Sequence, residues 1–153
     1  MPRILTKFFG DRECDSESLY SFPCGLPGFE EQHSFLFLSM PGSEPLLFMQ
    51  SMTTRSLCFV LLPILVIDPS YCLQLTPEDI SLLQLPAGSS PRIGMDVLCA
   101  AMVCSEGGET PTANLMSPVV VNLRAKTGVQ VIQCDRGYSH RHQLNFEEAV
   151  VTC

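Results

Sequence analysis

The chain has little positive charge: nine lysines and arginines stand against sixteen acidic residues, a formal net charge of −7 over 153 residues. Affinity for nucleic acids comes mainly from basic side chains that neutralise phosphates, so we expect no direct binding of DNA or RNA. An acidic surface would instead attract a basic protein and speed its encounter. The plainer alternative, an acidic protein whose charge only keeps it in solution, is also compatible with the composition.

Long apolar segments are missing as well. The longest, residues 57–67, is interrupted by Pro63 and falls well short of the ~20 apolar residues that a membrane helix needs. Near the N-terminus, the basic residues are followed closely by three more charged residues, Asp11, Arg12 and Glu13. This leaves no room for the apolar region of a signal peptide. We therefore expect a cytoplasmic protein that does not contact a membrane.

The sequence contains no CxxC motif, although it has eight cysteines. The chain is also longer than the small secreted domains that depend on disulfides. Cys58, Cys99 and Cys104 lie in apolar runs, where a thiol serves as a small hydrophobic side chain. These features predict free thiols in a reducing compartment.

Apolar residues make up 46% of the chain and alternate with polar residues, and many of them are aromatic or β-branched. This pattern predicts strands at residues 3–9, 18–22, 34–40, 46–51, 57–62, 65–73, 95–104, 113–123 and 129–134. Turn-forming residues separate most of these segments. The clearest hairpin signal is the KTG sequence at 126–128, where we expect Gly128 to adopt a positive φ.

One helix is predicted to begin after Thr76. Thr76 suits the N-cap, Pro77 suits the first helical position, and Asp79 suits the positive end of the helix. The helix should end near Leu85, because Pro86 disfavours helical geometry in the residue before it.

The number and length of these elements indicate the fold class. Many short strands with one short helix predict a mainly β fold, a small antiparallel β-barrel-like or sandwich domain. This single domain should span residues 1–144, and the weakly patterned tail at 145–153 should fray.

Few residues suggest catalysis. His140 and His142 would lie on one face of a strand with Cys134 upstream, and these three residues could bind a metal or supply a Cys–His pair. The alternative is an exposed, polar strand end. No cysteine lies at a helix start or in a visibly basic segment, where a thiolate would be stabilised. We therefore expect no enzymatic activity, metal or cofactor, with a thiol- or metal-dependent small enzyme as the alternative.

The stiffest segment is FPCGLPGF at residues 22–29, which combines two prolines with two glycines: Pro23, Pro27, Gly25 and Gly28. Proline restricts φ and lacks an N–H donor, whereas glycine allows tight backbone geometry. Phe22, Leu26 and Phe29 then leave the backbone in fixed directions. A rigid loop with apolar anchors loses little entropy when it docks onto a partner. The alternative for Phe22 and Phe29 is burial in the core.

Several short motifs occur in order and at compatible spacing along residues 4–144. They are TKFFG at 6–10, FPxGLPGF at 22–29, MQS at 49–51, FV at 59–60, DPxY at 68–71, TANLxxPVVVN at 112–122, GVQVI at 128–132 and YSxRHxL at 138–144. Together these motifs resemble the FliW family of flagellar assembly factors. The resemblance covers nearly the whole chain.

The resemblance implies a non-enzymatic cytoplasmic protein with a small β-barrel-like fold and two protein partners. Members of the family bind newly made flagellin and alternatively bind the RNA-binding translational regulator CsrA. Once flagellin has been exported, the freed factor binds CsrA and weakens its grip on flagellin messenger RNA. The negative net charge suits this role, because an RNA-binding regulator is basic.

The sequence departs from the family at two places that bear charge. Members often have an acid directly after the tyrosine that matches Tyr71 and another two positions on, but this chain continues Cys72-Leu73-Gln74. Position 24 is cysteine where glutamate is common. If the missing acids contact CsrA in other members, that contact is weaker here or has moved.

We expect the partner-binding surface to combine the stiff corner with the strand end after Asp68 and the C-terminal motif. Its residues are Phe22, Gly25, Leu26, Pro27, Gly28, Phe29, Asp68, Tyr71, Asn114, Tyr138, Arg141 and His142. Asn114 and Asn122 could instead satisfy backbone groups in turns.

Overall fold

The part of the chain that the computed structural model describes, residues 3–6, 10–13, 18–105, 107–134 and 137–144, is mainly β structure. Its strands are β1 (Arg3–Thr6), β2 (Gly10–Glu13), β3 (Leu19–Ser21), β4 (Ser34–Leu38), β5 (Leu47–Ser51), β6 (Cys58–Pro63), β7 (Val97–Cys104), β8 (Thr112–Ala113), β9 (Val119–Asn122), β10 (Thr127–Gln130) and β11 (His142–Gln143). Its helices are α1 (Ile64–Ile67) and α2 (Pro77–Leu82). The predicted tail 145–153 and residues 7–9 of the first predicted strand lie outside the described residues.

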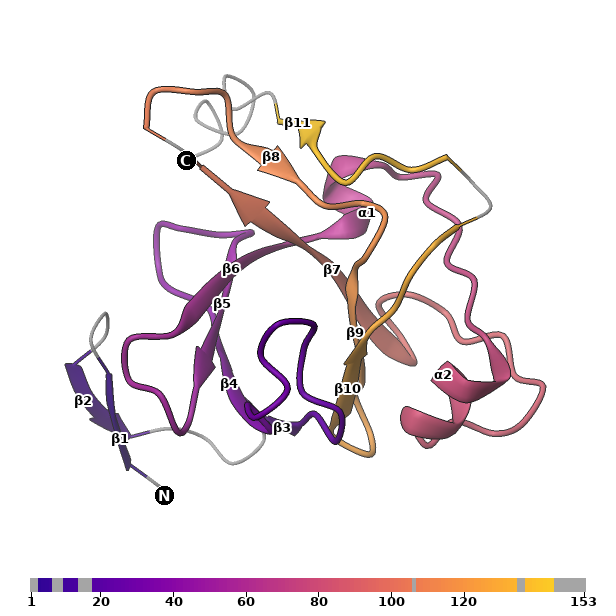
Figure 1. Cartoon of the computed structure of the whole chain (residues 1–153), viewed down its shortest axis with the longest axis horizontal. Helices are drawn as coiled ribbons and strands as arrows, with labels where there is room; N and C mark the ends of the chain where they lie inside the picture. The colour runs from indigo at the N-terminus through magenta and orange to yellow at the C-terminus, as the bar shows by residue number, and fades with distance from the viewer. Residues whose placement is uncertain (1–2, 7–9, 14–17, 106, 135–136, 145–153) are drawn as a thin grey trace.

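Seven strands close into a barrel in the order β7-β6-β5-β4-β3-β10-β9, because β7 pairs with both β6 and β9 (Figure 1). All these pairings are antiparallel except that of β3 with β10, which is parallel and brings Thr127 opposite Ser21. The end of β7 leaves the barrel and pairs with β8, which pairs with β11. β1 and β2 form a separate hairpin. The predicted mainly β, barrel-like fold is confirmed.

Alternation along the barrel strands produces two large cores, and a small third cluster surrounds the buried Leu36. The barrel interior holds Tyr20, Phe22, Leu26, Phe35, Phe37, Met49, Leu61, Ala100, Val119 and Val121. A second core on the outer face includes Leu62, Ile64, Tyr71, Leu83, Cys99, Ala101, Leu115, Val120 and Val131. Chain neighbours such as Ala100 and Ala101 belong to different cores, because successive side chains of a strand point to opposite faces.

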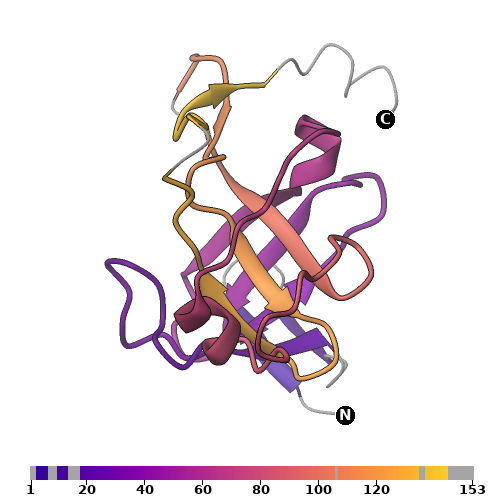
Figure 2. The same cartoon turned by 90° about the vertical axis from the view of Figure 1, so that its right-hand side faces the viewer.

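Residues 64–96 run along the outside of the barrel between β6 and β7 and carry both helices (Figures 1 and 2). The carbonyl of Leu83, directly after α2, accepts hydrogen bonds from Asn122 Nδ2 at 2.8 Å and from Thr127 Oγ1 at 3.2 Å. Leu83 is fully buried. Since buried polar groups need partners, these bonds fasten the covering segment to the β9–β10 hairpin.

Helix α2 begins as predicted. Thr76 Oγ1 accepts a bond from the Asp79 N–H, and Asp79 Oδ2 accepts one from the Thr76 N–H, both at 3.0 Å. The helix ends at Leu82, earlier than predicted, because Gln84 adopts a φ of 56° and closes it with a left-handed residue. Neither described helix is long and apolar enough to cross a membrane.

The strand predicted at residues 65–73 is wrong. β6 ends at Pro63, and the next four residues form the single turn α1, closed by a bond from the Asp68 N–H to the Ile64 carbonyl at 2.9 Å. Pro63 has no N–H with which to continue a ladder. Asp68 Oδ1 then accepts a bond from the Ser70 N–H at 2.9 Å, which turns the chain again. The described chain therefore has two short helices where one was predicted.

The strand predicted at 113–123 is divided into β8 and β9. Asn114 Oδ1 accepts hydrogen bonds from the N–H groups of Met116 at 3.1 Å and Ser117 at 3.0 Å, which bends the chain between the two strands. Asparagine favours such local side-chain bonds over a regular ladder. β2 was not predicted at all.

Gly128 does not have the positive φ that we predicted. Lys126 takes the left-handed conformation, with a φ of 60°, and Gly128 lies within β10. The reason for a glycine is space: a Cβ atom at this position would lie 2.5 Å from Phe22 Cζ and 2.7 Å from Val121 Cγ1. Gly128 thus leaves room for the tip of the Phe22 ring beside β10 in the barrel core.

We expect the substitution Gly128→Ala to lower the free energy of unfolding by about 1–3 kcal/mol, because the added methyl group overpacks the barrel core. Gly107→Ala is the matched control, since a Cβ atom there meets no atom within 4 Å. Urea denaturation measures both changes. Equal stability of the two variants would contradict the packing described for Phe22.

Candidate protein-interaction surface

The corner loop, residues 22–33 between β3 and β4, lies in front of one end of the barrel (Figure 1). Leu26 and Phe29 exchange both of their backbone hydrogen bonds, at 3.2 and 2.7 Å, across a tight turn. Gly25 and Gly28 have φ values of 64° and 83°, a region that favours glycine. The loop therefore has a fixed backbone conformation.

The corner loop buries two of its apolar side chains and presents the third. Phe22 and Leu26 are 0 and 1% exposed and belong to the barrel core, so the core alternative describes Phe22. Phe29 is 40% exposed and meets Phe59 edge-to-face, with ring centroids 5.3 Å apart. Phe59 in turn contacts the buried ring of Phe35. Phe29 is thus braced from beneath while its outer face stays accessible.

A polar cluster fastens the corner loop to the turn after β5. Gln32 Oε1 accepts hydrogen bonds from Ser51 Oγ at 2.5 Å and from Thr53 Oγ1 at 2.9 Å. Gln32 Nε2 donates to Thr54 Oγ1 at 2.8 Å. These bonds cross between two loops, so they hold the position of the corner loop relative to the barrel.

The corner groove, with a volume of about 350 Å³, runs beside the exposed ring of Phe29. It is lined by Leu26, Pro27, Phe29, Phe59, Met102, Asn114, Ser117, Gln130 and Ile132. Most of these residues are apolar and none is charged, a composition typical of binding sites. Ile132 is 61% exposed, so two large apolar side chains are available in this groove.

The structure brings the predicted residue Asn114 into the corner groove together with Leu26, Pro27 and Phe29. The Asn114 side chain also holds the turn that follows it, the backbone role foreseen as an alternative. Asn122 plays a similar part, because its Oδ1 accepts bonds from the backbone after β9. Asn122 lies outside the groove.

A second group of predicted residues gathers around two stacked tyrosines. The rings of Tyr71 and Tyr138 lie 4.2 Å apart at an angle of 21°. The Tyr71 hydroxyl donates to the Leu115 carbonyl at 2.5 Å, and the Tyr138 hydroxyl accepts a bond from the Cys72 N–H at 2.9 Å. Burial raises the pKa of the Tyr71 hydroxyl, which keeps it protonated as a donor. Tyr71 is 6% exposed and thus serves the core.

The charged residues predicted for the surface are Asp68, Arg141 and His142. Asp68 precedes Tyr71 and holds a turn, whereas Arg141 and His142 are exposed beside β8. Residues 113–117 join the two groups, since Asn114 lines the corner groove and the next residue receives the Tyr71 hydrogen bond.

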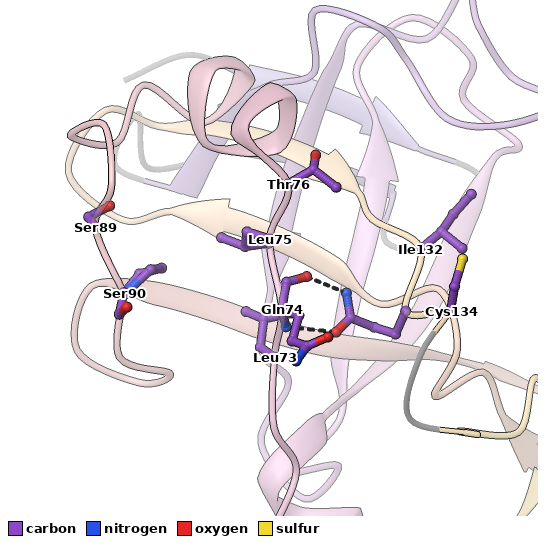
Figure 3. Close-up of a pocket in the computed structure, with 10 residues that line it drawn as sticks. Leu73, Gln74, Leu75, Thr76, Ser89, Ser90, Ile132 and Cys134 are labelled. Carbon is purple, nitrogen blue, oxygen red and sulfur yellow. Dashed lines mark hydrogen bonds between the residues drawn. The ribbon is translucent and has the colours of Figure 1, made fainter.

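The edge groove, with a volume of about 540 Å³, lies along the extended segment 73–76 (Figure 3). It is lined by Leu73, Gln74, Leu75, Thr76, Ser89, Ser90, Pro91, Ile132, Gln133 and Cys134. The N–H of Gln74 donates to Gln133 Oε1 at 2.7 Å, and Gln133 Nε2 donates back to the Gln74 carbonyl at 2.6 Å. Ile132 lines both grooves, and its side chain, 61% exposed, is called the ridge below.

The residues considered for catalysis are exposed: Cys134, His140 and His142. Among the described residues, no three His, Cys, Asp or Glu side chains lie close enough to hold a metal ion. Burial raises the pKa of Cys58 to about 11 and that of Cys99 to about 12. Both thiols therefore stay protonated near neutral pH, where they cannot act as nucleophiles.

Sequence reasoning did not single out Ile132, Phe59 or Gln133. Alternation could have identified Ile132, because it is out of phase with Val129 and Val131 of the outer core and in phase with Gln130, which lines the same groove. The contribution of Gln133 depends on the course of residues 72–76, which no local pattern indicated.

Comparisons with known proteins agree over almost the whole chain. The family model described as "FliW protein" matches residues 3–144. The flagellar assembly factor FliW of Geobacillus kaustophilus is 32% identical over 148 residues, with 97% of this chain and 98% of the relative covered. The Bacillus subtilis factor is 28% identical over 144 residues, with 94% and 97% covered. A crystal structure of the flagellar assembly factor FliW superposes with a TM-score of 0.81 at 30% identity and covers 96% of this chain and 99% of its own. The chain therefore belongs to the FliW family of flagellar assembly factors.

Proposed function

We propose that this flagellar assembly factor works in the cytoplasm by holding other proteins, without catalysis and without a cofactor. It binds newly made flagellin and, when free of flagellin, binds a CsrA-type translational regulator and weakens the repression of flagellin messenger RNA. The family resemblance supplies the two partners. The observation that carries the binding role is the corner groove, whose exposed Phe29 is braced on the core.

The geometry of the corner loop favours tight docking. A side chain that is already held in place loses little conformational entropy when a partner covers it. Phe29 is held by Phe59 beneath it and by the turn through Gly28, and Gln32 anchors the loop behind it. Aromatic residues that are rigid, central and surrounded by apolar contacts dominate the energetics of many interfaces.

The charge of the chain favours the basic partner. A net charge of −7 attracts an RNA-binding regulator and accelerates its association. Direct nucleic-acid binding remains disfavoured, because nine basic residues spread along the chain offer no cluster for phosphates.

Ile132 offers a physical reason for the alternation between partners. It lines both the corner groove and the edge groove and is 61% exposed. A partner that covers Ile132 from one groove removes that apolar surface from a partner in the other groove. Two partners that each need this ridge therefore exclude one another.

Titration calorimetry with flagellin and with CsrA, first separately and then in competition, tests the proposal. We expect each partner to bind at micromolar concentrations or tighter, and saturation with flagellin to prevent CsrA binding. If neither protein binds at these concentrations, the proposed function is wrong even though the family assignment holds.

Alanine substitutions test the shared ridge. We expect Ile132→Ala to weaken the binding of both partners by about tenfold, which corresponds to ~1.4 kcal/mol of lost apolar contact. Phe29→Ala should weaken only the partner in the corner groove. Met95→Ala is the control, because Met95 is 65% exposed but lines neither groove. An Ile132 variant that binds both partners normally would contradict the shared contact.

Thiol reactivity tests the burial of Cys58 and Cys99. At pH 8 we expect iodoacetamide to modify the exposed Cys24, Cys72 and Cys134 of the native protein. Cys58 and Cys99 should react only after denaturation, because burial raises the pKa of these thiols to about 11 and about 12 and keeps them protonated. Peptide mass spectrometry locates each label, and rapid native labelling of Cys99 would contradict its burial.

A further inference from the structure

The side chain of Gln50, on β5, holds the turn that follows this strand. Gln50 is fully buried and lines neither groove. Its Nε2 donates hydrogen bonds to the carbonyls of Ser51 at 3.0 Å, Arg55 at 3.2 Å and Thr54 at 3.4 Å. Carbonyl groups that lose such a donor are left unpaired, which costs free energy wherever water does not replace it. The amide therefore fixes the course of residues 51–55.

The oxygen of the same amide serves no other element. Gln50 Oε1 is buried and makes no hydrogen bond within the part of the chain that the structure describes. A buried acceptor without a donor costs free energy, and an apolar side chain of similar shape would avoid that cost. The polar contribution of Gln50 is thus one-sided, because all of its hydrogen bonds go to the turn.

Thr54 connects this turn to the corner loop. Its carbonyl accepts the bond from Gln50, and its hydroxyl accepts a bond from Gln32 Nε2 at 2.8 Å. The backbone N–H of Gln32 in turn donates to the Phe29 carbonyl at 3.1 Å. A continuous chain of contacts therefore leads from the buried amide to the backbone of the exposed aromatic residue.

Ser51 supplies a second link between the turn and the corner loop. Its Oγ accepts bonds from the N–H groups of Thr53 at 3.1 Å and Thr54 at 2.9 Å, and it donates to Gln32 Oε1. Ser51 is itself buried. Both polar atoms of the Gln32 amide are thus bonded to the turn, so this side chain keeps its orientation only while the turn keeps its shape.

We propose that Gln50 is a positioning residue for partner binding. It holds the turn after β5 and, through Gln32, the corner loop, so that Phe29 is presented in one orientation. Without the amide Phe29 would move more freely, and a partner would have to immobilise it at a cost in conformational entropy. That a partner covers Phe29 rests on the proposed function, whereas the hold of Gln50 on the corner loop follows from the hydrogen bonds alone.

A tryptophan reporter tests the positioning without any partner. The chain contains no tryptophan, so Phe29→Trp introduces a single one at the exposed site. Gln50→Met keeps the length of the side chain but removes the donor, and we expect it to lower the fluorescence anisotropy of this reporter because local motion increases. Thr127→Val is the matched control, since it removes another buried bond, to the Leu83 carbonyl, and lines neither groove. It should leave the anisotropy unchanged.

A double-mutant cycle tests the effect on binding. Gln50→Met should weaken the partner that Phe29→Ala identifies in the corner groove about two- to tenfold, the entropic cost of immobilising one side chain. In the Phe29→Ala background it should have no further effect, because no ring remains to be positioned. Titration calorimetry of the four proteins with full-length CsrA and with flagellin measures the affinities. Equal losses in both backgrounds would overturn the inference.

Gln32→Ala interrupts the same chain of contacts one step later. Gln32 is only partly buried, so its replacement disturbs the core less than that of Gln50. We expect the same loss of reporter anisotropy and of partner affinity, and this variant carries the test if Gln50→Met does not fold.

The outcomes separate this inference from the proposed function. If the reporter keeps its anisotropy in Gln50→Met, or loses it equally in Thr127→Val, Gln50 does not position Phe29 and the inference is wrong whatever the partners do. If the anisotropy falls but partner affinity is unchanged, the binding role is wrong and the proposed function stands. If the wild-type protein binds neither CsrA nor flagellin, the proposed function fails and the binding role falls with it, while the anisotropy still decides whether Gln50 holds the loop.

Discussion

The whole structure depends on the double pairing of β7. Residues 97–100 of β7 bond to β9 and its centre bonds to β6, which closes the sheet into a barrel in which each of the seven strands pairs with two neighbours. Closure creates an interior narrow enough for a few aromatic rings to fill. That interior then fixes the corner loop, because Phe22 and Leu26 reach into it.

Contacts with this core also hold side chains at the surface in place. The buried ring of Phe35 supports Phe59, which supports the exposed ring of Phe29. On the other side, the chain that covers the barrel runs from α1 through an extended segment to α2, and Leu83 is fastened by hydrogen bonds from Asn122 and from the neighbouring strand. Both grooves are thus built from parts that need no rearrangement to accept a partner.

Local chemistry made some of this predictable. The capping box at Thr76 and the tight turns of the corner loop depend on residues within a few positions of one another, so the sequence alone indicated them. The strand predicted at 65–73 failed because an apolar run has the same composition in a buried strand and in a covering loop. The same difference holds for the candidate site. The local sequence of the corner loop made Phe29 predictable, whereas the hydrogen bonds between Gln133 and Gln74 join residues far apart in the chain.

The ridge at Ile132 has a consequence for how such a protein can change over evolutionary time. Under the proposed function, in which each groove holds one partner, a substitution at Ile132 that improves the fit to one partner also alters the fit to the other, because this side chain lines both grooves. The two interfaces would then evolve together. Sequence divergence between lineages should therefore be slower on this ridge than at the outer rims of either groove, and changes there should be matched by changes in both partners.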